Sequence, residues 1–336
     1  MKNRAHGFVF TLLAFAVLTS SAALAATAPR CGNYQVAPDG RCFLQVWFPW
    51  VAVQDATATG SPSAGGWKSW IELTNPSADN IQVSLNATLT DTTNAGASFT
   101  IRGNQNNPLT NGAASAIVLN GPYGFDFPPG GILDIRLFSA GGVDQFNTPS
   151  SDLLDGPATL TFYSADPAAL DAQGAAQISF LYYPVFTGTG PPPLVVSPIW
   201  QCTSTGVRQD QAVNGIYSMV TIALHPNGAS NPLTDENSTF AVVNISQSQQ
   251  TVTISLADDS GMPVPQAASI QQAIAPGASY ANTVGNFFSA YLNSLPADTP
   301  SPSARKIMFQ SNDKIAVVVL RVVGNAGTAL PIWPLP

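Results

Sequence analysis

Aromatic clusters are the residues of this sequence best suited to binding chemistry. Trp50 and Trp67 each have a second tryptophan three residues away, and Tyr123 precedes two phenylalanines. Flat aromatic faces match the C–H surfaces of pyranose rings, so exposed tryptophans can stack on sugars. Polar loops on a rigid scaffold also make binding contacts, and the Asn-rich run at 104–107 is one such loop. The candidate ligand-binding residues are therefore Trp50, Trp67, Tyr123, Asn104, Asn106 and Asn107.

The alternative is that these tryptophans pack in a core. Side chains on a strand alternate between its two faces, so residues three apart point in opposite directions. In each of the pairs Trp47/Trp50 and Trp67/Trp70, at least one ring is therefore expected to be buried, in the core or between domains.

Catalytic side chains are scarce. His225 is the one histidine outside the first 25 residues, and it ends an apolar run before a proline, where a local hydrogen bond is the simpler role. A glycosidase needs two carboxylates about 5–10 Å apart, but the chain has only two glutamates, Glu72 and Glu236. No Gly-x-Ser-x-Gly turn is present. We expect a non-catalytic protein. A hydrolase with an Asp–Glu pair ranks third, behind a structural or adhesion role and a carbohydrate-binding role.

Acidic loops raise the question of a metal site. Asp258-Asp259 and Asp235-Glu236 could offer oxygen ligands to calcium, but neither has the spacing of a calcium-binding loop. Short Asp-rich turns more often hydrogen-bond their own backbone. Three cysteines with one histidine do not suit zinc, and no glycine-rich loop placed to bind phosphates is present. We expect no metal and no cofactor.

The composition indicates a polar surface with few charges. Of 336 residues 9% are charged, against ~25% in average soluble proteins. The formal net charge is −7, and 27 glycines and 28 prolines mark many turns. These values exclude a basic nucleic-acid-binding protein and a coiled coil. They also make anionic polymers poor partners. The expected partner is a protein or a polysaccharide at the cell exterior.

The N-terminus has the pattern of a secretory signal peptide at 1–25. Lys2 and Arg4 precede an apolar run at 8–18, and a small-x-small cleavage site follows at 23–25. A membrane anchor is the alternative, but the run is shorter than the ~20 residues that span a bilayer. The expected product is exported, to the periplasm, the cell surface or the medium, without a membrane span.

Export permits disulfides, and three cysteines follow the predicted signal. Cys31 and Cys42 flank a turn-rich loop, which favours a disulfide between them that staples the N-terminal segment 26–42. Cys202 is then left over. The alternative pairing joins Cys202 to one of the two early cysteines.

Beyond residue 42 the pattern is that of an all-β protein. Short runs rich in Val, Ile, Thr and aromatic residues are separated by Gly, Pro, Asn and Ser clusters. In the run 81–89 each odd position is apolar and each even position polar, which is typical of a half-buried antiparallel strand. Only 284–295 has helical spacing.

An internal repeat is the most informative feature of the chain. The motif LTNPS at 73–77 matches VVNIS at 242–246, at an offset of 169 residues. The segments 127–130 and 162–166 match 274–277 and 309–313, both at an offset of 147. Constant offsets of this size predict two copies of one domain.

The strand spacing within each copy predicts an immunoglobulin-like β-sandwich. We therefore expect two tandem sandwiches, at 43–187 and 203–336, joined by a Pro- and Gly-rich linker at 188–202. The first copy contains the longer loops.

The proline that follows the opening strand, the Gly-Gly-Trp at 65–67 and the motif IELTNP at 71–76 together resemble secreted tandem Ig-like repeat proteins of environmental bacteria. The resemblance covers most of the mature chain and implies the same two-sandwich fold. Some such modules sit beside adhesins and extracellular enzymes, which implies a role at the cell exterior. The shared motifs are structural, so no catalytic residue is carried over.

Two binding functions follow from these patterns. The first is an exported structural or adhesion protein that meets a partner, or further copies of itself, through loops or sheet edges. The second is a carbohydrate-binding protein that uses the candidate aromatic residues.

Overall fold

The computed structural model describes residues 31–53, 66–91, 98–102, 125–137, 154–173, 176–183, 200–218, 236–295, 306–323, 326–330 and 332–335. Most of them are in strands, which confirms the expected all-β class. The predicted signal peptide at 1–25 lies outside the described residues.

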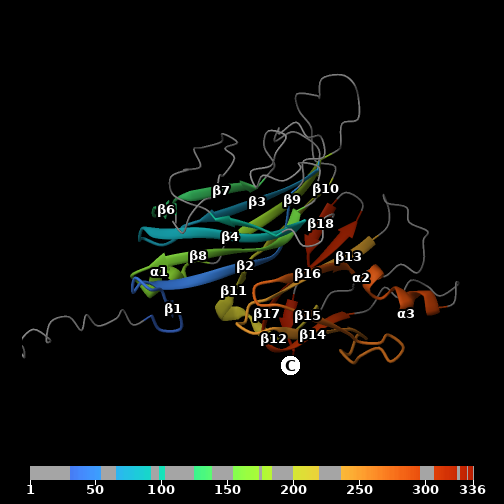
Figure 1. Ribbon diagram of the computed structural model, residues 1–336. Coiled ribbons are helices and arrows are strands. Elements are labelled where there is room, and N and C mark those ends of the chain that lie inside the picture. Colours follow the sequence, from blue (N-terminus) through green and yellow to red (C-terminus); the bar gives the residue numbers. More distant parts are fainter. Residues whose placement is uncertain are drawn as a thin grey trace, which may run out of the picture.

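The strands form two hydrogen-bonded sheets (Figure 1). The first sheet faces part of the second across one apolar core, and the remainder of the second sheet encloses a second core of its own. Among the described residues the first sheet has 7 strands. Its order is β1 (Gln35–Val36), β2 (Cys42–Val53), β8 (Leu154–Ser164), β4 (Ile81–Asp91) and β5 (Ser98–Arg102), with β11 (Val207–Arg208) on β2 and β6 (Phe125–Phe127) on β4.

The second sheet has 12 strands in the part of the chain that the structure describes. Its order is β7 (Ile132–Leu137), β3 (Gly66–Thr74), β9 (Gln177–Tyr183), β10 (Trp200–Thr205), β18 (Ala326–Ala329), β17 (Lys306–Val323), β14 (Gln250–Ala257) and β15 (Ile270–Ile274). Four strands lie off this path: β12 (Val213–Ser218) and β13 (Glu236–Asn244) pair with β17, β16 (Ser279–Thr283) pairs with β13, and β19 (Ile332–Pro334) pairs with β12.

Helices in the described residues are short: α1 (Pro167–Asp171), the 3-10 turn η1 (Gln209–Gln211), α2 (Val284–Phe287) and α3 (Ser289–Ser294). The last two confirm the helical spacing at 284–295. Helix α1 was not predicted from the sequence, although its start has a clear signal. Asp166 caps the backbone N–H of Ala168, and Pro167 occupies the first turn.

Strand β4 shows how alternating apolar and polar residues give a half-buried strand. Ile81, Val83 and Leu85 are buried in the first core, whereas Gln82 and Ser84 on the other face are partly exposed. One face of the strand thus packs on the sheet opposite and the other reaches solvent, as the sequence predicted.

The internal repeat is present in the strand registers. Thr74 of β3 pairs with Ile132 of β7, and the residue 169 positions later, Val243, pairs with Ser279 of β16. The pairing of β4 with β6 is likewise repeated by β14 with β15. We call the strands from β2 to β10 the N-terminal repeat and those from β12 to β18 the C-terminal repeat.

A buried asparagine organises the same corner of each repeat. The Asn75 side chain donates to the carbonyls of Asp79 and Phe127, at 2.9 and 2.8 Å, and accepts from the backbone N–H and hydroxyl of Ser77. Asn244 makes the equivalent four bonds, to Ser248, Ile274 and Ser246. Both asparagines are fully buried, so their hydrogen bonds fix the turn between two strands.

The two repeats differ after this corner. In the N-terminal repeat the chain runs through β8, α1 and β9, whereas in the C-terminal repeat the single 18-residue strand β17 covers the same path. The first part of β17 pairs with β12 and β14, and its second part pairs with β13 and β18. The N-terminal repeat therefore carries an added helix where the C-terminal repeat has a continuous strand.

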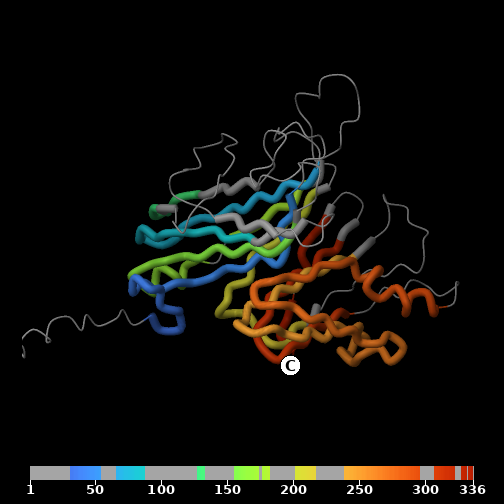
Figure 2. The backbone as a smooth tube through the Cα atoms, in the orientation of Figure 1, coloured from blue at the N-terminus to red at the C-terminus, as the bar shows by residue number. Residues whose placement is uncertain are grey.

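The repeats are joined by backbone hydrogen bonds within one sheet. Strand β10 pairs antiparallel with β9 and parallel with β18, so that Cys202 lies opposite Gly327. Residues 200–202, at the end of the segment predicted as a linker, lie in β10. Figure 2 shows the yellow segment after β10 passing between the blue and green N-terminal repeat and the orange and red C-terminal repeat. This strand pairing joins the two repeats in one sheet.

The junction buries both faces of β13 and of the second half of β17. Phe240 and Val319 face the core of the C-terminal repeat, whereas Ala241, Val318 and Leu320 belong to the core cluster of the N-terminal repeat. A strand that is covered on both faces typically has a continuous run of apolar residues in its sequence. This explains why residues 315–320 are all apolar, although most other strands alternate.

Candidate functional site: a groove between the two repeats

A cavity of about 320 Å³ lies where the repeats meet. Its residues come from β2, β3 and β8 of the N-terminal repeat and from β13, β16 and β17 of the C-terminal repeat. We call it the groove. Because its two walls belong to different repeats, the groove depends on the shared sheet formed by β10 and β18.

Two tryptophans form the wall from the N-terminal repeat. Trp50 and Trp67 are partly buried, with ring centroids 5.5 Å apart and ring planes at 80°. Trp50 also packs against Phe180, at a centroid distance of 5.0 Å. Edge-to-face aromatic packing of this kind fixes the rings in place before any ligand arrives.

A β-bulge directs Trp50 into the groove. Between Phe48 and Val51 the register of β2 against β8 shifts, and Pro49 lies within that interval. Proline has no N–H for the ladder and is tolerated at bulges, which re-aim the neighbouring side chains. Next to the bulge, the Ser69 hydroxyl of β3 donates to the Ala52 carbonyl at 2.8 Å and accepts from its N–H, which ties the two sheets together.

Asp155 is the ionisable side chain among the described groove residues. One of its carboxylate oxygens accepts a hydrogen bond from the Trp50 indole N–H at 2.9 Å. Burial raises the pKa of the Asp155 carboxyl above its usual range, and the Trp50 hydrogen bond opposes that rise only in part. In the part of the chain that the structure describes, Asp155 makes no ion pair.

The facing wall from the C-terminal repeat is aliphatic, with small polar groups along one side. Ala241, Val318 and Leu320 are buried and provide the apolar surface. Asn282 lies on β16, where its amide donates to the Tyr280 hydroxyl at 3.0 Å and its carbonyl accepts from the backbone N–H of Thr283. The groove is thus mainly apolar, with one carboxylate and a few neutral polar groups.

The structure brings two of the predicted ligand-binding residues together, since Trp50 and Trp67 form one wall of the groove. The neighbouring Trp47 lies elsewhere: it and Val207 pack against a separate apolar cluster. Asp155 was not predicted, and no local sequence motif marks it. The other predicted residues, Tyr123, Asn104, Asn106 and Asn107, lie outside the described residues, as does His225.

The disulfide prediction is confirmed: Cys31 and Cys42 are bonded, with Cα atoms 5.3 Å apart. The alternative pairing through Cys202 is wrong. Cys202 is a free thiol, 2% exposed, and burial raises its pKa to about 11. Strand β10 places this side chain in the core of the N-terminal repeat.

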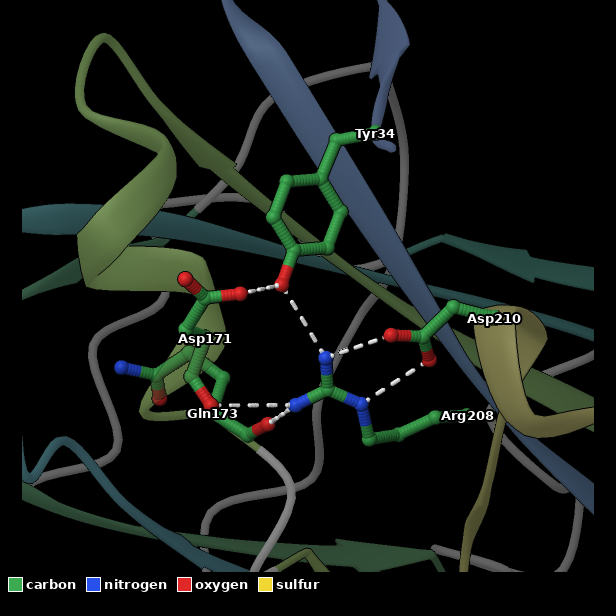
Figure 3. Close-up of polar contacts among 5 residues, drawn as sticks. All are labelled: Tyr34, Asp171, Gln173, Arg208 and Asp210. Atoms are coloured by element: carbon green, nitrogen blue, oxygen red, sulfur yellow. Dashed lines mark hydrogen bonds and ion pairs between the residues drawn. The ribbon is translucent and has the colours of Figure 1, made fainter. Parts of the chain in front are cut away.

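A second group of side chains, which we call the Arg208 cluster, holds the chain segment that crosses from β10 to β12 (Figure 3). The Arg208 guanidinium donates twice to Asp210, at 3.0 and 2.8 Å, and once to the Tyr34 hydroxyl at 3.1 Å. It also donates to the backbone carbonyls of Asp171 and Gln173. The Tyr34 hydroxyl in turn donates to the Asp171 carboxylate.

The Arg208 cluster connects to the buried asparagine corner. Gln173 is 1% exposed, and its amide donates to Asn75 at 3.0 Å. The crossing segment lies directly on β2, since a Cβ at Gly206 would come within 2.3 Å of Val46. The sequence contained little sign of this cluster beyond an arginine two residues before an aspartate.

The acidic loop at Asp258 forms a local turn. Its carboxylate accepts from the backbone N–H groups of Ser260 and Met262, at 2.9 and 3.0 Å. This is the self-bonded turn that the sequence favoured over a calcium loop. Within the described residues no group of three or more potential metal-ligating side chains comes together. The described helices are all too short to cross a membrane.

None of the protein-family models, curated proteins or solved structures compared with the chain matches it.

Proposed function

We propose that this chain is an exported, non-catalytic interaction protein, structural or adhesive, that holds a ligand in the groove between two immunoglobulin-like sandwiches. The observation that carries the proposal is the meeting of Trp50 and Trp67 on one wall, opposite an aliphatic wall from the other repeat. Ligand sites are typically concave and mainly apolar with a few polar groups, and this groove has that character. The disulfide supports export, because such bonds persist in oxidising compartments.

A polysaccharide is the second candidate partner, and a specific observation favours it. The tryptophans named from the sequence lie beside a carboxylate and an amide, Asp155 and Asn282, which could accept and donate sugar hydroxyl hydrogen bonds. An aromatic surface next to such groups suits a pyranose ring.

A groove-filling variant tests the site. Ala281 is exposed on the edge strand β16 and lines the groove, so Ala281→Phe should obstruct it without entering a core. Ala273 is an exposed alanine on the edge strand β15, outside the groove, and Ala273→Phe is the matched control. The two variants add the same side chain to the same repeat.

Affinity electrophoresis through gels that contain neutral, cationic or anionic polysaccharides gives the readout for the second candidate. Retardation of the wild type and of Ala273→Phe, but not of Ala281→Phe, would support polysaccharide binding in the groove. Equal retardation of all three would place binding elsewhere.

Light scattering behind size exclusion, over a hundredfold range of concentration, tests self-association. Assembly of the wild type that Ala281→Phe abolishes and Ala273→Phe retains would support a second copy as the groove's occupant. Assembly sensitive to Ala273→Phe would instead indicate the sheet edge at β15.

A further inference from the structure

Asp155 carries a charge that the described residues leave incompletely compensated. Its carboxylate has acceptor sites for about four hydrogen bonds, and one donor, the Trp50 indole, reaches it. The surrounding groove is apolar, and burial of an ion without a partner is costly. No lysine or arginine is among the groove residues that the structure describes. A cation that entered the groove would supply the missing partner.

The aromatic wall suits the same cation. A positive group within about 6 Å of an indole face is attracted by the ring quadrupole, and tryptophan is the strongest aromatic partner. Because Trp50 and Trp67 meet at 80°, their rings form a corner rather than a flat platform. A rounded cation with apolar substituents contacts two such rings at once, whereas a flat sugar ring stacks on one.

The facing wall explains why the cation should carry carbon substituents. Ala241, Val318 and Leu320 offer methyl and methylene surface, which a hydrated inorganic ion would not cover. The cavity, about 320 Å³, is at the small end of the range for organic ligands. The formal net charge of −7 also attracts cations to the protein.

We propose that the groove binds an organic ammonium group, with its charge paired to Asp155 and its substituents against Trp50, Trp67 and the aliphatic wall. The inference rests on the proposed function, since it names the ligand class of the same groove. Two sources share this chemistry: a quaternary ammonium of the choline type and the ammonium of an amino sugar.

Calorimetric titration of the wild type with matched pairs of charged and neutral probes tests directly whether the groove prefers a positive charge. Choline and 3,3-dimethylbutan-1-ol have nearly the same shape and differ in charge, and glucosamine and glucose form a second matched pair. We expect choline to bind at least about tenfold more tightly than its neutral analogue. Preference for glucosamine over glucose, with weak choline binding, would assign the amino-sugar source and keep the proposal.

Asp155→Asn tests the assigned partner. The amide retains an acceptor for the Trp50 indole but removes the charge, so choline affinity should fall about tenfold while the neutral analogue is unaffected. Asp79→Asn is the matched control, because Asp79 is exposed and outside the groove and loses the same charge. The two-dimensional NMR spectrum of the tryptophan indole N–H groups reports in the same samples whether the fold and the ring environment persist.

Equal affinity for the charged and neutral members of both pairs would overturn the proposal, and so would binding that Asp155→Asn leaves unchanged. Failure of every ammonium probe would overturn it as well. These results would leave the proposed function standing if Ala281→Phe still abolished polysaccharide binding or assembly. The proposed function is contradicted separately, if Ala281→Phe changes neither polysaccharide binding nor assembly.

Discussion

The Arg208 cluster and the groove both lie where the repeats meet, and they differ in how completely their charges are satisfied. Arg208 has five N–H donors, and five hydrogen bonds to protein acceptors use them. Asp155 receives one hydrogen bond and faces no cation among the described groove residues. A saturated charge indicates a structural contact, whereas a carboxylate with unused acceptor sites beside aromatic rings indicates a place for a ligand. Substitutions in the first region should reduce stability, and those in the second should alter binding.

The largest effect is expected at the buried asparagines. Asn75→Ala and Asn244→Ala each remove the four hydrogen bonds that the two corners share and leave one buried carbonyl, of Phe127 or Ile274, without that donor. Each should therefore lower the free energy of unfolding by about 3 kcal/mol. Asn75 also accepts from Gln173 and thereby supports the Arg208 cluster. We expect Asn75→Ala to cost about 1 kcal/mol more than Asn244→Ala.

Urea unfolding followed by circular dichroism measures this difference. Asn86→Ala is the control, because Asn86 is exposed on β4 and its loss should change stability by less than about 0.5 kcal/mol. Equal losses at the two buried asparagines would show that Gln173 adds nothing to the N-terminal repeat.

Removal of the disulfide should have the next largest effect. It closes a loop with a sequence separation of 11 residues and holds Tyr34 at the Arg208 cluster. The double variant Cys31→Ala/Cys42→Ala should lose about 3 kcal/mol by loop-closure entropy. The C-terminal repeat has no such bond among its described residues, so this loss sharpens the difference between the repeats.

Wild-type protein under reducing conditions should unfold at the same urea concentration as that double variant. Cys202 serves as the internal control, because a buried thiol of raised pKa should resist alkylation until the protein unfolds. Alkylation of Cys202 in the folded, oxidised protein would contradict its placement in the core.

Arg208→Ala should cost about 2 kcal/mol, mainly because the partly buried Gln173 carbonyl and Tyr34 hydroxyl lose their donor. The pair with Asp210 is partly exposed and contributes less. Arg208→Lys should recover only part of the loss, since an ammonium cannot reach all of these acceptors at once. Thermal melts of the three proteins test the order, and choline affinity should stay unchanged in both variants. A change in affinity would show that the two regions are coupled.

The sequence predicted the repeated framework well because short, local patterns encode it. The motifs at 73–77 and 242–246 contain Asn75 and Asn244 with the serines that bond them, and alternation at 81–89 sets the buried face of β4. The junction was harder to predict. Strands β10 and β18 are short and contain few apolar residues, and their pairing joins positions more than a hundred residues apart. The groove follows from that pairing, so Trp50 and Trp67 could be named from the sequence but not brought together with Asp155.

The smallest expected effect on stability is in the groove, and it has the opposite sign. The pKa of Asp155 is raised in the folded protein, so folding binds its proton more tightly than the unfolded chain does. Its ionisation therefore costs stability at neutral pH, and that cost disappears as the pH falls through the raised pKa. Asp155→Asn should increase stability at pH 7 by less than about 1 kcal/mol.

Asp210 provides the contrast, because its pKa is lowered by the Arg208 hydrogen bond. It stabilises the fold above the usual range for aspartate, and this stabilisation is lost as the pH falls through the lowered pKa. Melting temperatures from pH 3 to pH 8 for the wild type, Asp155→Asn and Asp210→Asn separate the two. The gain from Asp155→Asn should shrink toward acid, and choline binding to the wild type should weaken over the same interval, because the neutral carboxyl no longer attracts the ammonium. A gain that stays constant with pH would mean that Asp155 is not ionised in the groove, and the groove would then resemble the Arg208 cluster in holding no unsatisfied charge.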